Sequence, residues 1–324
     1  MTIPVAKPPV IFIMGPTASG KTDLAIALRA HLPVEIISVD SAQVYKTLDI
    51  GSAKVASGVR KKHPHALIDI RDPSEVYSVA DFLQDAKRHI KDISARGNIP
   101  LLVGGTMMYF KILYGGLSDL PRANSTVRDE ILRRATEQGW QSLHDELTRL
   151  DPETARKLHP NHSQRIQRAL EVIKITGKPL SALQVKVVDK GLEHDYGVVP
   201  IALISDNRQL LHERIEQRFL QMMKLGLLDE VRALHQRDDL SPDLPAMRAA
   251  GYQQLWQHLD GHFDIDEAIN RAVVASRQLA KRQFTWLRKW SDAERIIIDD
   301  GEQFLSCEKI CKQTLKILSN HSIL

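Results

Sequence analysis

Four largely apolar runs along the chain predict the buried strands of a parallel sheet. They occupy residues 9–14, 34–39, 99–103 and 198–204. Strands of a parallel sheet are covered on both faces, so they are nearly continuously apolar instead of alternating with polar residues. A further run at residues 65–70 predicts a third strand or an edge segment.

Segments with helical spacing lie between these strands. Residues 21–28 and 78–96 place apolar side chains three and four positions apart, and the second segment begins at Ser78 and stops at Gly97. Strand, helix and strand in this order are typical of βαβ units. The pattern therefore predicts an α/β fold with a parallel sheet.

The middle of the chain has helical spacing and little strand character. Because a strand follows it at residues 198–204, we expect residues 122–196 to form an all-helical subdomain inserted into a core made of residues 1–121 and 197–324. Helix starts and stops divide this insertion into segments at 125–139, 140–150, 152–158 and 161–177.

The last third of the chain predicts more helices and one more strand. The longest helix carries Arg208, Arg214 and Arg218, of which the last two share a face. The predicted helices are 207–236 with a break at Gly226, 247–260, 266–290 and 303–318, and the strand is 295–299.

A glycine-rich loop follows the first strand and precedes the first helix. It fits the pattern G-x-x-x-x-G-K-[ST], in which backbone amides and a helix N-terminus hold phosphate oxygens, the lysine adds a positive charge, and the hydroxyl can bind Mg²⁺. This context predicts a P-loop NTPase-like core with helices on both faces of the sheet. The loop residues are Gly15, Pro16, Thr17, Ala18, Ser19, Gly20, Lys21 and Thr22.

The ends of two other strands add candidate chemistry at the same edge of the sheet. Asp40 follows the strand at residues 34–39, so it either closes a surface turn or faces a ligand. The strand at 99–103 ends in Gly104, where a nucleotide-hydrolysing enzyme usually has an acidic residue that holds Mg²⁺. The loop is therefore suited to binding a diphosphate without ATP hydrolysis.

Composition and charge limit the remaining classes. The chain has 324 residues, 43% of them hydrophobic, and a net charge of +4. With neither a membrane span nor a secretory signal, we expect a cytoplasmic protein. Arg277, Lys281 and Arg288 fall within about 40° of one another on a helix, and this stripe without acidic residues favours a polyanionic partner.

Taken in order, these motifs resemble those of the tRNA dimethylallyltransferases, also called tRNA isopentenyltransferases, of the bacterial type. The resemblance covers nearly the whole chain. It rests on the loop at residues 15–22, on Ser38 to Lys46, Asp49 to Gly51, His65 to Asp69 and Val103 to Tyr109, and downstream on Gln164 to Glu171, Arg248 to Tyr252 and Lys281 to Arg288.

This resemblance implies transfer of a dimethylallyl group from dimethylallyl diphosphate to N6 of the adenosine immediately 3′ of the anticodon. Asp40 matches the family's catalytic base and Arg218 its diphosphate contact, while Lys21 stabilises the leaving group and Thr22 binds Mg²⁺. The insertion would grip the tRNA anticodon stem-loop. The implied tRNA contacts are Asp40, Ser41, Ala42, Gln43, Thr106, Arg128, Gln164, Arg165, Ile166, Gln167, Arg168, Arg248, Ala249, Ala250, Gly251, Tyr252, Gln253, Lys281, Arg282, Gln283, Phe284, Thr285, Trp286, Leu287 and Arg288.

Two departures and three alternatives accompany this interpretation. Gln253 stands where many relatives have Arg, and Asn124 stands where relatives often have Asp. An adenylate isopentenyltransferase would share the loop and Asp40 but modify a free nucleotide. A small-molecule kinase would use the same loop, and a pure RNA-binding protein would only sense phosphate with it. We expect a monomer that acts without a membrane.

Overall fold

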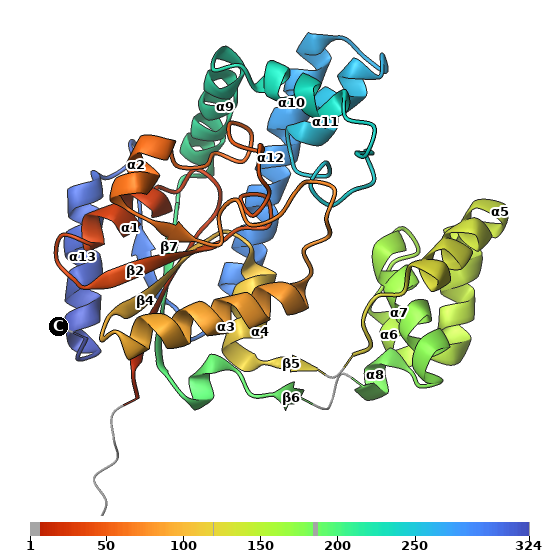
Figure 1. The fold of residues 1–324 in the computed structure, drawn as a ribbon, viewed down its shortest axis with the longest axis horizontal. Coiled ribbons are helices and arrows are strands. Elements are labelled where there is room, and N and C mark those ends of the chain that lie inside the picture. The colour runs from red at the N-terminus through yellow and green to blue at the C-terminus, as the bar shows by residue number, and fades with distance from the viewer. Residues whose placement is uncertain (1–6, 119, 184–186, 324) are drawn as a thin grey trace, which may run out of the picture. The chain divides into compact units, whose positions relative to one another are not determined.

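The computed structural model describes residues 7–118, 120–183 and 187–323. The chain divides into two compact units, the core Met1–Tyr114 with Asp195–Leu324, and the helical unit Gly115–His194 (Figure 1). Among the described residues, no helix is both long and apolar enough to span a bilayer.

The core is built on a six-stranded sheet, and the predicted α/β fold is confirmed. Every pairing within this sheet is parallel, and the strand order is β3-β2-β4-β1-β7-β8. The strands are β1 (Pro9–Met14), β2 (Val34–Val39), β3 (His65–Ala66), β4 (Ile99–Gly104), β7 (Gly197–Ile204) and β8 (Glu294–Ile297).

One predicted strand is shorter than expected. Residues 65–70 form only the two-residue β3, because Leu67 and Asp69 adopt φ values of 65° and 58°. This left-handed conformation is incompatible with an extended ladder. The segment instead binds the turn that follows β2, where the backbone N–H groups of Asp69 and Ile70 donate to the carbonyl oxygens of Gln43 and Val44.

Helices cover both faces of the sheet. On one face, α1 (Lys21–Leu28) and α13 (Cys307–Asn320) bury Leu24, Leu28 and Ile310 against Ile11 and Ile13 of β1. On the other face lie α3 (Val79–Ala95) and α4 (Met107–Gly115). Side chains alternate along a strand, so Phe12 points to this second face and packs 5.0 Å from Phe110 of α4 between ring centroids.

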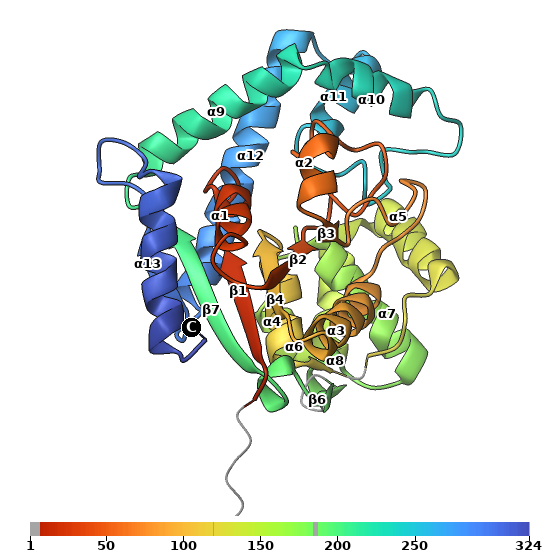
Figure 2. The ribbon, with the colours of Figure 1, turned by 60° about the vertical axis from the view of Figure 1, so that its left-hand side comes forward.

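Two long helices of the core extend beyond the sheet, and shorter helices join their far ends (Figure 2). They are α9 (Arg208–Lys224) and α12 (Ile265–Arg288), with α10 (Leu227–His235) and α11 (Tyr252–Leu259) between them in sequence. The predicted break is confirmed, since Gly226 has a φ of 97°. The helix predicted from residue 247 begins only at Tyr252, because the preceding Gly251 has a φ of 94°.

The helical unit has its own small core. Helix α5 (Ser125–Leu150) kinks at Gly139, whose φ is 80°, and packs on α7 (Ser163–Thr176) through Ile131, Leu147 and Ile166. Its other elements are β5 (Leu117–Ser118), which pairs antiparallel with β6 (Val187–Asp189), the helices α6 (Pro152–Arg156) and α8 (Leu180–Leu183), and the 3₁₀ helix η1 (Leu192–His194).

Candidate active site

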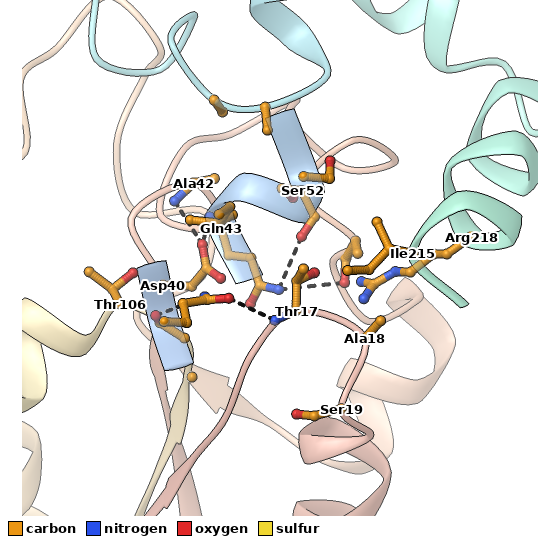
Figure 3. A pocket seen from close by; sticks show the side chains of 18 of the residues that line it. Thr17, Ala18, Ser19, Asp40, Ala42, Gln43, Ser52, Thr106, Ile215 and Arg218 are labelled. Atoms are coloured by element: carbon orange, nitrogen blue, oxygen red, sulfur yellow. Dashed lines mark hydrogen bonds between the residues drawn. The ribbon is translucent and has the colours of Figure 1, made fainter. Parts of the chain in front are cut away.

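A cavity of about 1330 Å³ opens at the carboxyl ends of the central strands. Strand β4 pairs with both β1 and β2, and Gly104 is level with Met14 and Val39. The segments that follow these three strands therefore meet at one edge, where ligands bind in open α/β sheets. Helices α9 and α12 also line the cavity, as do side chains from residues 51–59 and 245–254; Figure 3 shows part of this lining.

The glycine-rich loop after β1 is folded as a phosphate cradle. Ala18 and Gly20 have φ values of 64° and 80°, a combination that wraps the backbone around the start of α1. The Lys21 ammonium donates to the carbonyl oxygen of Pro16 and, at 3.3 Å, to Ser19 Oγ. Thr22, the second residue of α1, lines the cavity as predicted for a hydroxyl that could bind a cation.

Positive charge collects at this loop without an equal number of carboxylates. The pKa of Lys21 is lowered to about 7, mainly by burial and also by the neighbouring Arg218, while Asp40 opposes the shift. Arg218 reaches from α9 toward the loop (Figure 3), and burial also lowers its pKa. Within the described part of the chain, the Arg218 guanidinium has no ion-pair partner. Two neighbouring buried cations whose pKa values are both lowered indicate a site for an anion.

Arg214 adds a third cation to the cavity wall. It lies one helical turn before Arg218 on α9, and its guanidinium stacks 4.4 Å from the ring centre of Phe304. Its charge is among the influences that lower the pKa of Arg218. The spacing in sequence predicted that both arginines share a face, and the structure confirms this.

Asp40 combines the two roles that its position in the sequence left open. Its Oδ1 accepts hydrogen bonds from the backbone N–H groups of Ala42 at 2.8 Å and Gln43 at 3.2 Å, so it does close a turn. The residue also lines the cavity (Figure 3). Among the described residues, no hydrogen bond to its second oxygen is present, which leaves that oxygen able to accept a proton.

The turn after β4 excludes a carboxylate for steric reasons. A Cβ atom at Gly104 would lie 2.0 Å from the carbonyl oxygen of Val39, so this position admits no side chain. Two residues later, Thr106 Oγ1 accepts the backbone N–H of Ser41 at 3.1 Å and ties the turn to the Asp40 segment. The cation site of an ATP-hydrolysing enzyme is therefore absent at the end of this strand.

Gln283 of α12 lines the cavity, and its predicted RNA contact stays a prediction. It is 8% exposed, its Oε1 accepts the N–H of Thr17 at 2.9 Å, and its Nε2 donates to the Gly105 carbonyl oxygen at 2.9 Å. Both ends of the side chain are thus committed to the two loops of the core.

Tyr252 is also buried, at 0% exposure, and its hydroxyl donates to Glu230 Oε1 at 2.5 Å. Glu230 itself accepts the backbone N–H groups of Asp49, Ile50 and Gly51. This pair fixes the loop whose carbonyl oxygens at residues 52 and 53 accept the amide of Gln43. No motif pointed to Glu230, which lies on α10 and is 179 to 181 residues from the loop that it binds.

The remaining predicted RNA contacts of the core separate into two groups. One group lines the cavity: Ser41, Ala42, Gln43, Thr106, Arg248, Ala249, Ala250, Gln253, Arg282 and Trp286. The other group does not line it: Gly251, Lys281, Phe284, Thr285, Leu287 and Arg288. Leu287 is buried in the core.

The basic stripe on α12 needs a correction. We expected Arg277, Lys281 and Arg288 to form a surface without acidic residues, but Arg277 pairs with Glu216 of α9 at 2.6 Å. At 100° per residue the stripe also lies about 120° from Arg282 and about 160° from Trp286, two of the α12 side chains that line the cavity.

In the helical unit, two of the residues predicted to contact RNA form ion pairs within the unit itself. Arg128 and Arg168 both bind Glu171, at 3.0 and 2.7 Å. Burial alone would raise the pKa of Glu171, but hydrogen bonds from Arg168, the Asn124 backbone and Arg128 hold it below its usual value. The Gln167 amide donates to the Arg128 carbonyl oxygen and Ile166 is buried, whereas Gln164 and Arg165 are exposed.

The six-stranded parallel sheet and the loop after its first strand define an α/β protein of the P-loop class. The model of the IPP transferase family matches residues 43–290, and that of the isopentenyl transferase family matches residues 8–71. The chain belongs to the IPP transferase family.

Solved structures agree with this assignment. The full-length tRNA isopentenylpyrophosphate transferase from Bacillus halodurans is 37% identical, with a TM-score of 0.69 over 97% of this chain and 96% of that one. The tRNA delta(2)-isopentenylpyrophosphate transferase from Staphylococcus epidermidis is 31% identical, with a TM-score of 0.68 over 97% and 100%. A eukaryotic dimethylallyltransferase acting on tRNA is 27% identical, with a TM-score of 0.79 over 98% and 79%.

Proposed function

We propose that this tRNA isopentenyltransferase transfers a dimethylallyl group from dimethylallyl diphosphate to N6 of the adenosine immediately 3′ of the anticodon. The observation that carries the proposal is the gathering of Lys21, Arg214 and Arg218 around a phosphate loop, with Asp40 in the same cavity. The cations suit a leaving diphosphate, and the carboxylate suits removal of a proton.

The donor half of the reaction needs stabilisation of negative charge. As the allylic C–O bond breaks, charge develops on the diphosphate, and preorganised cations and amide donors lower the energy of that state. Lys21, Arg218 and the amides of the loop supply these groups. Diphosphate binding would restore full protonation of Lys21, whose pKa of about 7 reflects burial beside another cation.

The acceptor half needs a base. An exocyclic adenine amine is a weak nucleophile because its lone pair is delocalised into the ring, so removal of its proton as the C–N bond forms assists the attack. Asp40 is suited to this role, since Oδ1 is held by two backbone amides and the second oxygen is left for the proton.

Mg²⁺ fits the donor chemistry of this site. It prefers oxygen ligands and usually combines one or two protein groups with phosphate oxygens and water. The Thr22 hydroxyl, which lines the cavity at the start of α1, is the group that would hold it. When bound, the ion would neutralise charge on the diphosphate.

The RNA must present an unstacked base to the cavity. Extrusion is least costly in a single-stranded loop, where flipped bases are held by stacking and by contacts to their edges. Arg248, Arg282 and Trp286 line the cavity and could contact the anticodon loop. We further propose that residues 122–196 grip the anticodon stem-loop, and that the protein acts as a monomer in the cytoplasm.

The decisive experiment is incubation with unmodified tRNA, Mg²⁺ and dimethylallyl diphosphate labelled in its allyl group. Label in the adenosine 3′ of the anticodon is the expected result, with Asp40→Asn as the matched inactive variant. Parallel tubes contain AMP in place of tRNA, or ATP with tRNA. Label in AMP would indicate a free-nucleotide prenyltransferase, and ATP consumption without label in RNA would indicate a kinase.

A further inference from the structure

A single buried side chain joins the phosphate loop, the turn after β4 and the helix that lines the cavity. Gln283 accepts the Thr17 N–H and donates to the Gly105 carbonyl oxygen, at 2.9 Å in each case. The contact is close, because a Cβ atom at Gly105 would lie 2.3 Å from Gln283 Nε2. Neither loop can move relative to α12 without breaking a buried hydrogen bond.

The two contacts demand opposite properties of the side chain. Thr17 offers a donor and Gly105 offers an acceptor, so the group between them must accept at one atom and donate at the other. A carboxamide does this at any pH. A carboxylate can only accept, and its second oxygen would face the Gly105 carbonyl oxygen. A protonated carboxylic acid meets both demands again.

Neighbours on the same helix connect Gln283 to both substrates. Ala280 lies in the same small hydrophobic cluster as Ala18, which follows Thr17 in the phosphate loop. Arg282 and Trp286 line the cavity where we place the RNA. The turn that Gln283 holds continues into Thr106, whose hydroxyl oxygen accepts the backbone N–H of Ser41 beside Asp40.

We propose that Gln283 is a positioning residue that sets the distance between the diphosphate cradle and the base at Asp40. This inference rests on the proposed function. The side chain fixes the loop that holds the donor and the turn that supports Asp40 within one frame. Errors of about 1 Å in such a frame can cost roughly 100-fold in rate. The expected loss is therefore in kcat, with a smaller change in the KM for tRNA.

The test uses Gln283→Glu, because its effect should depend on pH. At high pH the new carboxylate repels the Gly105 carbonyl oxygen, and kcat should fall about 10- to 100-fold relative to wild type. As pH falls, protonation restores a donor, and burial raises the pKa of this carboxyl group toward the assay range. The ratio of variant to wild-type kcat, measured from pH 9 to pH 5.5, should rise as pH falls.

Two further variants separate positioning from packing. Gln283→Met keeps the volume but makes neither hydrogen bond, so its kcat ratio should stay low at every pH. Gln313→Met on α13 makes the same chemical change at an exposed position and should behave as wild type. A flat ratio for Gln283→Glu, or full kcat in Gln283→Met, overturns the inference. Wild type without any label transfer would instead overturn the proposed function.

A variant that is partly unfolded would also have a lower kcat, so the stability of each variant is measured. Thermal melting of each variant shows whether it folds, and the pH-dependent recovery of Gln283→Glu is a readout that a general packing defect does not produce. If Gln283→Met fails to fold, the Gln283→Glu profile alone decides, since its volume and one of its hydrogen bonds are native.

Discussion

The cavity of the core and the helical unit both concentrate basic residues, but they differ in what neutralises the charge. In the helical unit, Arg128 and Arg168 share the fully buried Glu171. In the cavity, Lys21 and Arg218 lie near each other, and burial lowers the pKa of each. Removing one partner of a buried ion pair destabilises the fold, whereas buried cations that lack a carboxylate favour the binding of an anion.

This difference is informative because the sequence alone does not distinguish the basic residues of the cavity from those of the helical unit. Resemblance to relatives assigns Arg128 and Arg168 to RNA binding just as it assigns Arg218 to the diphosphate. The two arginines and one glutamate leave one positive charge in excess, and 41% of the Arg128 side chain is exposed. That excess is available to RNA, but removal of the cluster would first affect stability.

The largest expected effect is on chemistry in the cavity. Asp40→Asn should lower kcat by about 10² to 10⁴, or about 3–5 kcal/mol of transition-state stabilisation. Asparagine keeps an oxygen for the N–H groups of Ala42 and Gln43, so the turn survives. Single-turnover rates and the affinity for tRNA should be measured together. Full turnover in the variant would remove Asp40 from the mechanism.

The next effect is the pH dependence of diphosphate binding. Lys21 has a pKa of about 7, so the free protein loses this positive charge as pH rises, and pyrophosphate binding must then take up a proton. Affinity should fall about five- to tenfold between pH 7 and pH 8. Titration calorimetry of wild type and Lys21→Met separates this from the titration of pyrophosphate itself. Equal slopes in the two proteins would contradict the expectation.

The helical unit should respond in stability instead. Glu171→Gln should cost about 2 kcal/mol in the free energy of unfolding, less than a fully buried pair because water still reaches both arginines. Glu137→Gln on α5 breaks the exposed pair with Arg133 and should cost only about 0.3–0.5 kcal/mol. Urea unfolding measures both.

The same variant has a pH signature. The folded pKa of Glu171 is lowered, so its contribution is present above the unfolded pKa and is lost as pH falls. Wild type and Glu171→Gln should therefore converge in stability at acid pH. A constant difference between them down to low pH would show that the charge on Glu171 is not what stabilises the cluster.

The smallest effect compares two neighbours on α12. Arg282 lines the cavity and Lys281 does not. Arg282→Ala should weaken tRNA binding and reduce the slope of log K against log salt by about 0.7, the value for one phosphate contact in a single strand. Lys281→Ala should leave the slope closer to wild type. Equal reductions in both variants would place RNA on the outer face of the helix as well.

The sequence was sufficient for the parts of the molecule that local patterns determine. Five of the six strands of the core sheet, the phosphate loop, the break at Gly226 and the absence of an acid at Gly104 follow from residue types in order. Burial and long-range partners do not. Nothing in the sequence distinguishes Gln283, whose amide holds two loops, from an exposed glutamine, and nothing connects Glu230 to the loop at residues 49–51.

Two sequence predictions differ from the structure for a related reason. The strand predicted at residues 65–70 ends early because Leu67 and Asp69 take left-handed conformations, which leucine seldom adopts and aspartate adopts more readily. The stripe on α12 was predicted without acidic neighbours because only its own helix was considered, and Glu216 comes from α9. Both are consequences of packing between segments far apart in the chain.

The close spacing of β2 and β4 at Gly104 limits how this site could be redesigned for ATP chemistry. A phosphate loop of this kind could in principle be converted to ATP chemistry by one acidic substitution after β4, but the Val39 carbonyl oxygen occupies the space that its Cβ would need. Two strands would have to separate before a carboxylate could be accommodated. At position 104 the backbone therefore excludes the acidic residue that phosphoryl transfer commonly uses, and a single codon change there cannot supply it.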